Sequence, residues 1–219
     1  MDQAVKCTIL FDLDGTLIDS TEAILESFHK AFRFFGKEPP EDKQILTLIG
    51  HPLDFMFRHL GIKENVEEYV TRYKVEYRKI FKEKTKLLPT AREALKEAAT
   101  FAKLGVVTTK TGKYSRELLE YMGLMSYFGV LVGSEDVLHH KPHPEPILKA
   151  MHHLESDLQN SFMVGDTCLD MEAAHAANIT GIGVSCGYGS KEHMQKCSRH
   201  LFATPLEGVA FIKRVCQLV

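Results

Sequence analysis

The sequence predicts an α/β protein: a parallel sheet core with helices on both faces, interrupted by an inserted α-helical domain. Short apolar runs alternate with segments of helical period, and repeated strand, helix, strand order builds a parallel sheet. Each run is too short for a buried helix and is rich in β-branched or aromatic residues, as buried strands are. One interval between runs greatly exceeds the length that a crossover needs, which indicates the insertion.

The predicted elements follow one another in a regular order. The predicted strands are residues 7–12 (CTILFD), 104–109 (LGVVTT), 128–133 (FGVLVG), 162–166 (FMVGD) and 181–186 (GIGVSC). Helices are predicted at about 90–103, 114–123, 144–154 and 168–178, where apolar residues recur at helical spacing. This order is that of a Rossmann-like core.

The insertion lies between the first two strands, which are separated by about ninety residues where a crossover needs only a dozen or so. Two apolar stripes at helical spacing, within residues 24–35 and 66–80, predict a small helical bundle. We therefore expect residues 1–16 and 87–219 to form the core domain and residues 17–86 to form the inserted domain.

Bulk properties exclude several functional classes. The 219 residues carry a formal net charge of -2 with Lys and Arg scattered, which argues against nucleic-acid binding. The five cysteines are odd in number and form no C-x-x-C pair, which predicts reduced thiols rather than disulfides or zinc ligands. The sequence shows neither a signal-peptide pattern nor an apolar run near the roughly 18 residues of a membrane span. We expect a cytoplasmic monomer or homodimer without nucleic-acid or membrane partners.

Chemically useful side chains follow the predicted strands. In open parallel sheets, functional sites lie outside the carboxyl ends of the strands. We therefore expect one edge of the sheet to gather Asp12, Asp14, Thr108, Thr109, Lys141, Asp166 and Asp170. Asp12 and Asp14 repel one another unless a cation or a proton intervenes. The pair therefore indicates a site for a cation or for proton transfer.

These residues resemble the motifs of the haloacid dehalogenase (HAD) superfamily of hydrolases. The family pattern has D-x-D-G-T after the first strand, Thr or Ser after the second, Lys before a later helix and G-D-x-x-x-D after the fourth. The matching positions here are 12–16, Thr108, Lys141 and 165–170, in that order. The inserted helices resemble the family's helical cap, and VVTTK, KPHPEP and GDTCLD are most similar to the phosphoglycolate phosphatase branch.

The resemblance implies a magnesium-dependent phosphatase that hydrolyses a small phosphate monoester, similar to phosphoglycolate, through an aspartyl-phosphate. Asp12 would be the nucleophile, and Asp14 would be the general acid and then the general base. Mg²⁺ would bind to Asp12, to the backbone carbonyl of Asp14 and to Asp166. Asp170 either binds the ion directly or supports the site from the first turn of its helix.

The resemblance also assigns the phosphoryl group and the leaving group to different parts of the chain. Thr108, Thr109 and Lys141 would hold the phosphoryl oxygens and offset charge in the transition state. The cap would select the leaving group, with residues 48–60 as its facing surface and His51 as the candidate specificity residue. The alternative for His51 is that it merely caps a helix.

Other interpretations remain open. Inorganic pyrophosphatase is the nearest enzymatic rival, whereas a sugar-phosphate mutase is disfavoured because Leu53 stands where that branch has Arg. A non-catalytic phosphorylation switch of the receiver type also uses acidic residues, Thr and Lys, but such domains have no cap. Prolines interrupt the histidines beside Lys141, which are His139, His140 and His143, so no helix presents an i, i+4 pair of them. They are interpreted as surface residues rather than zinc ligands.

Overall fold

The structure, a computed structural model, describes residues 7–217, which contain a six-stranded parallel sheet in the order β5-β4-β1-β6-β7-β8. The strands are β1 (Cys7–Phe11), β4 (Ala102–Val107), β5 (Val130–Val132), β6 (Ser161–Gly165), β7 (Thr180–Val184) and β8 (Leu201–Phe202). The predicted α/β class is confirmed, and the five predicted strands are all present. The sixth, β8, pairs with β7 at the edge of the sheet.

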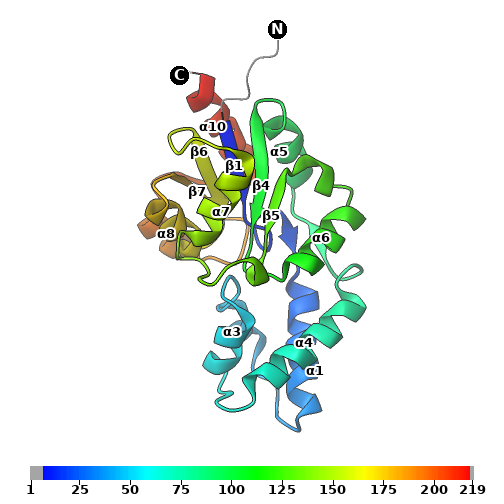
Figure 1. Ribbon diagram of the computed structural model, residues 1–219. Helices are drawn as coiled ribbons and strands as arrows, with labels where there is room; N and C mark the ends of the chain where they lie inside the picture. The colour runs from blue at the N-terminus through cyan, green and yellow to red at the C-terminus, as the bar shows by residue number, and fades with distance from the viewer. Residues whose placement is uncertain (1–6, 218–219) are drawn as a thin grey trace.

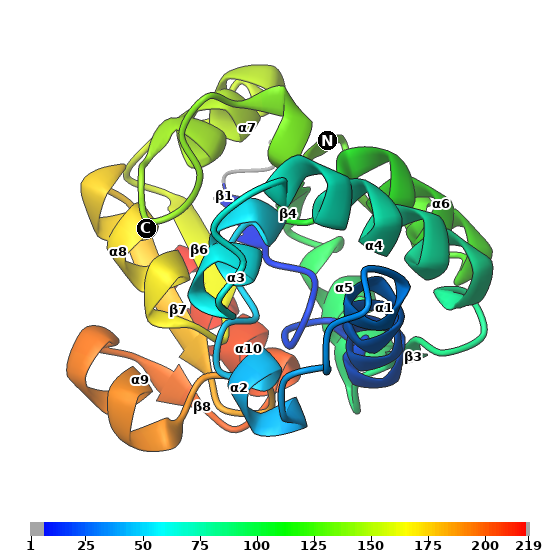
Figure 2. The same ribbon diagram turned by 90° about the horizontal axis from the view of Figure 1, so that it is seen from below.

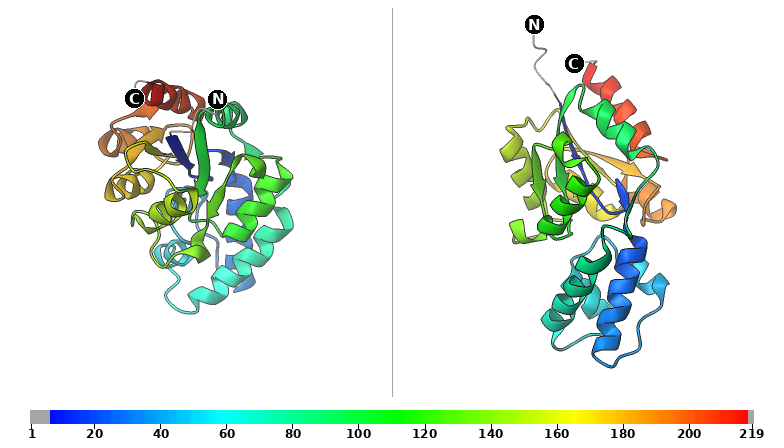
Figure 3. Two further views of the ribbon diagram at one scale, coloured as in Figure 1. Left: turned by 45° about the horizontal axis from the view of Figure 1, so that its top comes forward. Right: turned by 90° about the vertical axis from the view of Figure 1, so that its right-hand side faces the viewer.

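Helices cover both faces of the sheet (Figure 1). One face is covered by α7 (Glu145–Leu154) and α8 (Cys168–Ala176), and the other by α5 (Ala91–Ala98) and α10 (Pro205–Gln217), as the right-hand view of Figure 3 shows. The remaining core helices are α6 (Gly112–Tyr121), α9 (Lys191–Cys197) and the 3₁₀ turns η1 (Met125–Tyr127) and η2 (Ser134–Asp136). Helix α5 is shorter than the predicted 90–103, because the chain already enters β4 at Ala102.

The central strands are buried on both faces, which explains their nearly continuous apolar sequences. Leu10 of β1 packs in a cluster with Ile147 of α7. Its neighbour Ile9 packs in the opposite cluster with Leu95 of α5 and Ile212 of α10. Because successive strand side chains point to opposite faces, each apolar run contributes to both cores.

The inserted segment folds into four helices below the carboxyl edge of the sheet, nearest the viewer in Figure 2. They are α1 (Thr21–Phe34), α2 (Asp42–Leu46), α3 (Leu53–His59) and α4 (Val66–Ile80). The chain leaves the core through β2 (Ile18–Asp19) and returns through β3 (Lys86–Leu87), and these two strands pair antiparallel. The two connections therefore lie side by side.

Aromatic side chains form the centre of this helical group. Phe28 of α1 contacts Phe57 of α3 and Tyr73 of α4, with ring centroids 4.7 Å and 4.8 Å apart. Phe32 and Tyr69 extend the cluster. The apolar stripes are thus helix-packing surfaces, because offset and tilted ring pairs pack closely in protein cores.

The prediction that the cysteines are reduced thiols was wrong. Cys7 is bonded to Cys216, and Cys168 at the start of α8 is bonded to Cys197 at the end of α9. Within residues 7–217, Cys186 is the free cysteine. Sequence spacing does not show which cysteines meet, because the first pair spans 209 residues. The cytoplasmic location, which rested partly on reduced thiols, stays a prediction. None of the helices described here has the length and apolar character needed to cross a bilayer.

Candidate active site

Three buried carboxylates meet beyond the carboxyl ends of β1 and β6. Asp12, Asp166 and Asp170 each place an oxygen within 4.8 Å of the others. The Nζ of Lys141 lies 2.9 Å from Asp12 Oδ1, donates to Asp170 Oδ1 at 2.5 Å and donates to the carbonyl of Val107 at 3.0 Å. The structure therefore brings together residues that stand more than 150 positions apart in the chain.

The charges in this cluster do not balance, because three carboxylates face one ammonium. Burial raises the pKa of Asp12 to about 7, an effect that Lys141 opposes and Asp170 reinforces. Burial, followed by the charges of Asp12 and Asp170, raises the pKa of Asp166 well above its usual range. Burial disfavours the ammonium of Lys141, but the two adjacent carboxylates outweigh it and raise its pKa. The site therefore has an excess of negative charge that a cation would neutralise.

The loop after β1 is closed by a tight turn at Gly15. Its φ is +84°, and a Cβ there would lie 2.2 Å from Asp166 Oδ2. The carbonyl of Leu13 accepts hydrogen bonds from the amides of Leu17 and Ile18. Only glycine combines this conformation with so close an approach. The glycine of the D-x-D-G-T segment is therefore required for packing, whereas its aspartates carry the chemistry.

Asp166 is held by a hydroxyl and a backbone amide from two other loops. Thr16 Oγ1 donates to its Oδ1 at 2.8 Å, and the amide of Tyr188 donates to its Oδ2 at 2.8 Å. A Cβ at Gly187 would lie 2.2 Å from that same Oδ2. The glycines around Tyr188 thus let this loop approach the carboxylate. Sequence reasoning missed Tyr188, although the glycine-rich run after β7 is a visible signal of close backbone approach.

Asp170 uses both of its oxygens within the protein. Oδ1 accepts from Lys141, and Oδ2 accepts from the amide and the hydroxyl of Thr167, which closes a capping box at the start of α8. A Cβ at Gly165 would lie 2.3 Å from Asp170 Cγ. Asp170 therefore links the start of α8 to Lys141 and fixes the ammonium beside Asp12.

The two threonines after β4 have different surroundings. Thr108 is buried, and its Oγ1 accepts a hydrogen bond from the amide of Lys110. Thr109 instead donates its hydroxyl to the carbonyl of Gly50 in the inserted segment, at 2.9 Å. The hydroxyl of Thr109 therefore links the core to the helical group, whereas Thr108 stays buried at the end of β4.

Lys110 is a site residue that sequence reasoning missed. Its Nζ lies 2.8 Å and 3.0 Å from the two oxygens of Asp14 and 4.7 Å from the ring centre of Tyr77 on α4. Burial lowers its pKa, but the charge of Asp14 outweighs burial and the net pKa is well above the usual value. The available signal was its place in VVTTK, directly after the strand end. Lys110 fixes the Asp14 carboxylate at the boundary between core and inserted helices.

A cavity of about 270 Å³ lies between the core and the inserted helices, and Asp14, Lys110 and His51 all line it. His51 is half-buried, and its ring stacks on Phe55 with centroids 4.1 Å apart. Burial, and then the proximity of His59, lowers the pKa of His51 below its usual value. At neutral pH the ring is therefore uncharged and faces the cavity as a hydrogen-bonding group.

The acidic cluster is able to bind a divalent cation. Its donors are all oxygens, as hard cations such as Mg²⁺ prefer, and its three carboxylates share the single ammonium of Lys141, which leaves an excess of negative charge. Asp12, Asp166 and Asp170 each place a carboxylate oxygen within 4.8 Å of the other two, so all three are positioned around one possible ion site.

Comparison with known proteins agrees with this arrangement. Residues 9–184 match the haloacid dehalogenase-like hydrolase family. The chain belongs to this family. Together with the carboxylate motifs, the relatives identify it as a hydrolase of the phosphatase type.

Two relatives and two solved structures illustrate the likeness. The chain is 34% identical to "Probable phosphatase IndB" of Dickeya dadantii, over 87% of this chain and 86% of that protein. It is 34% identical to "Pyrophosphatase PpaX" of Anoxybacillus flavithermus, with coverage of 85% and 87%. A haloacid dehalogenase-like hydrolase from Streptococcus pneumoniae superposes with a TM-score of 0.86 at 26% identity, over 95% of this chain and 99% of the other. A predicted phosphoglycolate phosphatase from Haemophilus somnus, at 22% identity, has the same fold (TM-score 0.86, covering 95% and 99%).

Proposed function

We propose that this protein is a magnesium-dependent phosphatase that hydrolyses a small, phosphoglycolate-like phosphate monoester through an aspartyl-phosphate. The observation that carries the proposal is the position of Asp12. Its carboxylate is buried beside Asp166 and Lys141, while Asp14, two residues further on, lines the adjoining cavity. A nucleophile and a proton donor on one turn suit two-step displacement at phosphorus.

The chain's own groups account for both steps. In the first, an oxygen of Asp12 forms a bond to phosphorus, the bond to the leaving alkoxide breaks, and Asp14 gives that alkoxide its proton. In the second, Asp14 takes a proton from water as the water attacks phosphorus, and the bond to Asp12 breaks. Lys141 and the hydroxyl of Thr108 hold phosphoryl oxygens and offset their charge. Thr109, the other threonine at this strand end, holds the inserted segment in place.

The proposed magnesium ion would be held by Asp12 and Asp166, with the backbone carbonyl of Asp14 as a further oxygen donor. When bound, it neutralises charge on the phosphoryl oxygens and on the carboxylates around them. Asp170 would act indirectly, by holding Lys141 against Asp12. Direct ligation by Asp170 is the alternative, because a carboxylate oxygen that accepts one hydrogen bond keeps a second lone pair.

The cavity indicates which leaving group fits. Its wall on the inserted side includes Ile49, Leu53, Met56 and Val70. Lys74 also lines it, and no ion-pair partner of Lys74 is found among residues 7–217. The carboxylates of Asp54 and Glu135 line the cavity as well. Apolar walls, one unpaired ammonium and two carboxylates suit a small carbon-based leaving group with no more than one further anionic group, such as glycolate. We propose that residues 17–86 form the cap that closes over this group, with β2 and β3 as its paired connections.

Pyrophosphate is the second candidate substrate, because several relatives at 32% to 34% identity are named pyrophosphatases. Its leaving group is itself a phosphate, which near neutral pH carries up to one more negative charge than glycolate. The ammonium of Lys110 is already paired with Asp14. Apolar walls therefore favour the monoester over pyrophosphate.

Release of inorganic phosphate tests the proposal. Purified protein with Mg²⁺ is assayed on phosphoglycolate, pyrophosphate, a sugar 1-phosphate and p-nitrophenyl phosphate. Asp12→Asn serves as the inactive variant, and Asp42→Asn, an exposed carboxylate on α2, serves as the matched control. We expect the highest kcat/KM on phosphoglycolate. Preference for pyrophosphate would select the second candidate, and a stable phosphorylated protein without phosphate release would indicate a switch instead of an enzyme.

A further inference from the structure

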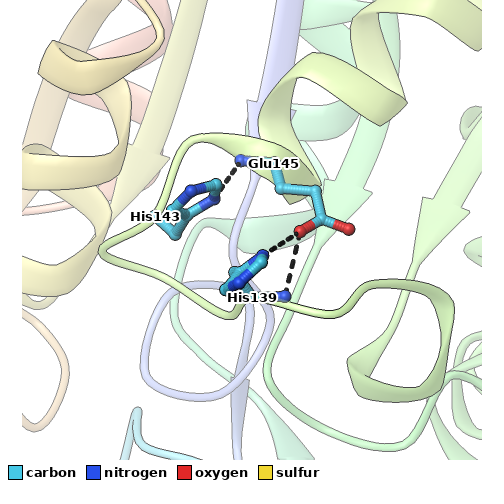
Figure 4. A group of neighbouring side chains, drawn as sticks. All are labelled: His139, His143 and Glu145. Atoms are coloured by element: carbon cyan, nitrogen blue, oxygen red, sulfur yellow. Dashed lines mark hydrogen bonds and ion pairs between the residues drawn. The ribbon is translucent and has the colours of Figure 1, made fainter.

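Two histidines and a glutamate meet on the surface at the start of α7, in the segment that also contains Lys141 (Figure 4). His139, His143 and Glu145 each place a donor atom within 4.8 Å of the other two. His139 Nδ1 lies 2.9 Å from Glu145 Oε2, and the two histidine rings have centroids 4.5 Å apart. We propose that these three side chains form a second metal site, specific for a transition-metal ion of the zinc class.

The local backbone holds the three donors in place. The amides of Leu138 and His139 both donate to the Glu145 carboxylate at 2.9 Å, which fixes that carboxylate against the loop. The amide of His143 donates to the carbonyl of His140, which turns the chain so that His143 faces the first turn of α7. These contacts bring His139 and His143 together although the segment between them is not a helix.

The protonation states suit a metal ligand set. The Nδ1 of His143 accepts a hydrogen bond from the amide of Glu145 at 3.2 Å, so this nitrogen carries an unprotonated lone pair. The Glu145 carboxylate accepts from the amides of Leu138 and His139 and offers a metal ion an anionic oxygen. The hydrogen bond between His139 Nδ1 and this carboxylate holds a proton at the place where a metal ion would bind both groups.

Small side-chain movements would complete the site. In a tetrahedral site with ligand bonds of about 2.1 Å, donor atoms lie about 3.4 Å apart. The 2.9 Å distance between His139 Nδ1 and Glu145 Oε2 would lengthen slightly. His143 would turn its Nδ1 away from the Glu145 amide, and water would then accept a hydrogen bond from that amide. The side chain of His139 is 63% exposed, so the ring is free to move and solvent can supply the remaining ligand.

Donor chemistry separates this site from the acidic cluster. Imidazole nitrogens select zinc, cobalt, nickel or copper, whereas the carboxylates of Asp12 and Asp166 select magnesium. Lys141 lies between His139 and His143 in the sequence, but its Nζ points to Asp12 and Asp170. One loop thus presents an ammonium to the acidic cluster and two imidazoles to solvent.

Cobalt binding to the whole, oxidised protein tests the proposal. Co²⁺ is titrated in excess Mg²⁺, which occupies the acidic cluster, and is followed by calorimetry and by visible absorption. We expect one equivalent to bind, with a d–d spectrum and without a thiolate-to-cobalt band. His139→Ala and His143→Ala should each weaken binding at least tenfold. His152→Ala, an exposed histidine on α7 outside the cluster, should leave it unchanged.

Three results would overturn the proposal. They are the absence of saturable cobalt binding, equal affinity in wild type and His143→Ala, and a thiolate band that assigns the ion to cysteine. Circular dichroism and thermal unfolding of each variant without metal verify that the fold is retained. Glu145→Gln is the further variant, because an amide oxygen keeps an acceptor for the backbone amides while removing the charged ligand.

Discussion

The Asp12→Asn variant measures how the charge of Asp12 affects folding stability, separately from the role of Asp12 as nucleophile. Folding raises the pKa of Asp12 from 3.8 to about 7, mainly by burial. This rise in the pKa corresponds to about 4 kcal/mol. The folded state therefore holds this proton more tightly than the unfolded state does. The resulting stability is fully present below pH 4 and is lost as pH rises through about 7.

The asparagine side chain cannot ionise, so the variant does not lose this stability as pH rises. Without metal at pH 8, we expect its free energy of unfolding to exceed that of wild type by up to about 4 kcal/mol, and we expect the difference to shrink toward zero at pH 4. Lys141 keeps Asp170 as a partner in the variant, so no buried ammonium is left unpaired. The same variant should lose phosphate release by several orders of magnitude, because the nucleophile is gone.

Urea unfolding in excess chelator, followed by circular dichroism at pH 8 and pH 4, measures this difference. Asp42→Asn is the control, because its carboxylate is largely exposed and its removal should change stability little at either pH. An Asp12→Asn protein that is no more stable than wild type at pH 8 would refute the electrostatic reasoning. Retained phosphatase activity would refute the assignment of the nucleophile.

Four further predictions follow from other contacts. Lys110→Met frees Asp14 from its fixed position and should lower kcat by roughly 10- to 100-fold; an unchanged kcat would remove Lys110 from the site. His51→Ala should raise KM for the preferred substrate more than for p-nitrophenyl phosphate, and equal changes would contradict a role in specificity. Chelation should abolish turnover, which Mg²⁺ but not Ca²⁺ should restore; activity that survives exhaustive chelation would count against the metal. Cys7→Ser opens the loop closed with Cys216 and should lower stability by up to about 5 kcal/mol. A reducing agent should lower the stability of wild type by more than that of the variant, because the variant keeps only the Cys168–Cys197 bond, and an equal effect on both proteins would argue against the Cys7–Cys216 bond.

The sequence alone determined the sheet and the edge at which its chemistry lies. Buried parallel strands require continuous apolar runs, so 7–12, 104–109 and 162–166 were recognisable without any tertiary information. Their carboxyl ends meet at one edge, which is why Asp12 and Asp166 could be expected to lie together before their contact was known. The length of the interval after the first strand likewise required an insertion.

Tertiary structure alone decided which loops meet at that edge. Lys110 reaches Asp14 across 96 residues of sequence, Tyr188 reaches Asp166 across 22, and Thr109 turns to Gly50 across 59. Such contacts depend on how helices pack over the sheet, and hydrophobic periodicity reports only which face of its own element a residue occupies. The disulfides belong to the same class, because cysteine spacing carries no information about the path of the chain between the two cysteines. Hydrophobic periodicity depends on one segment alone, whereas the partner of a polar side chain depends on how the whole molecule packs.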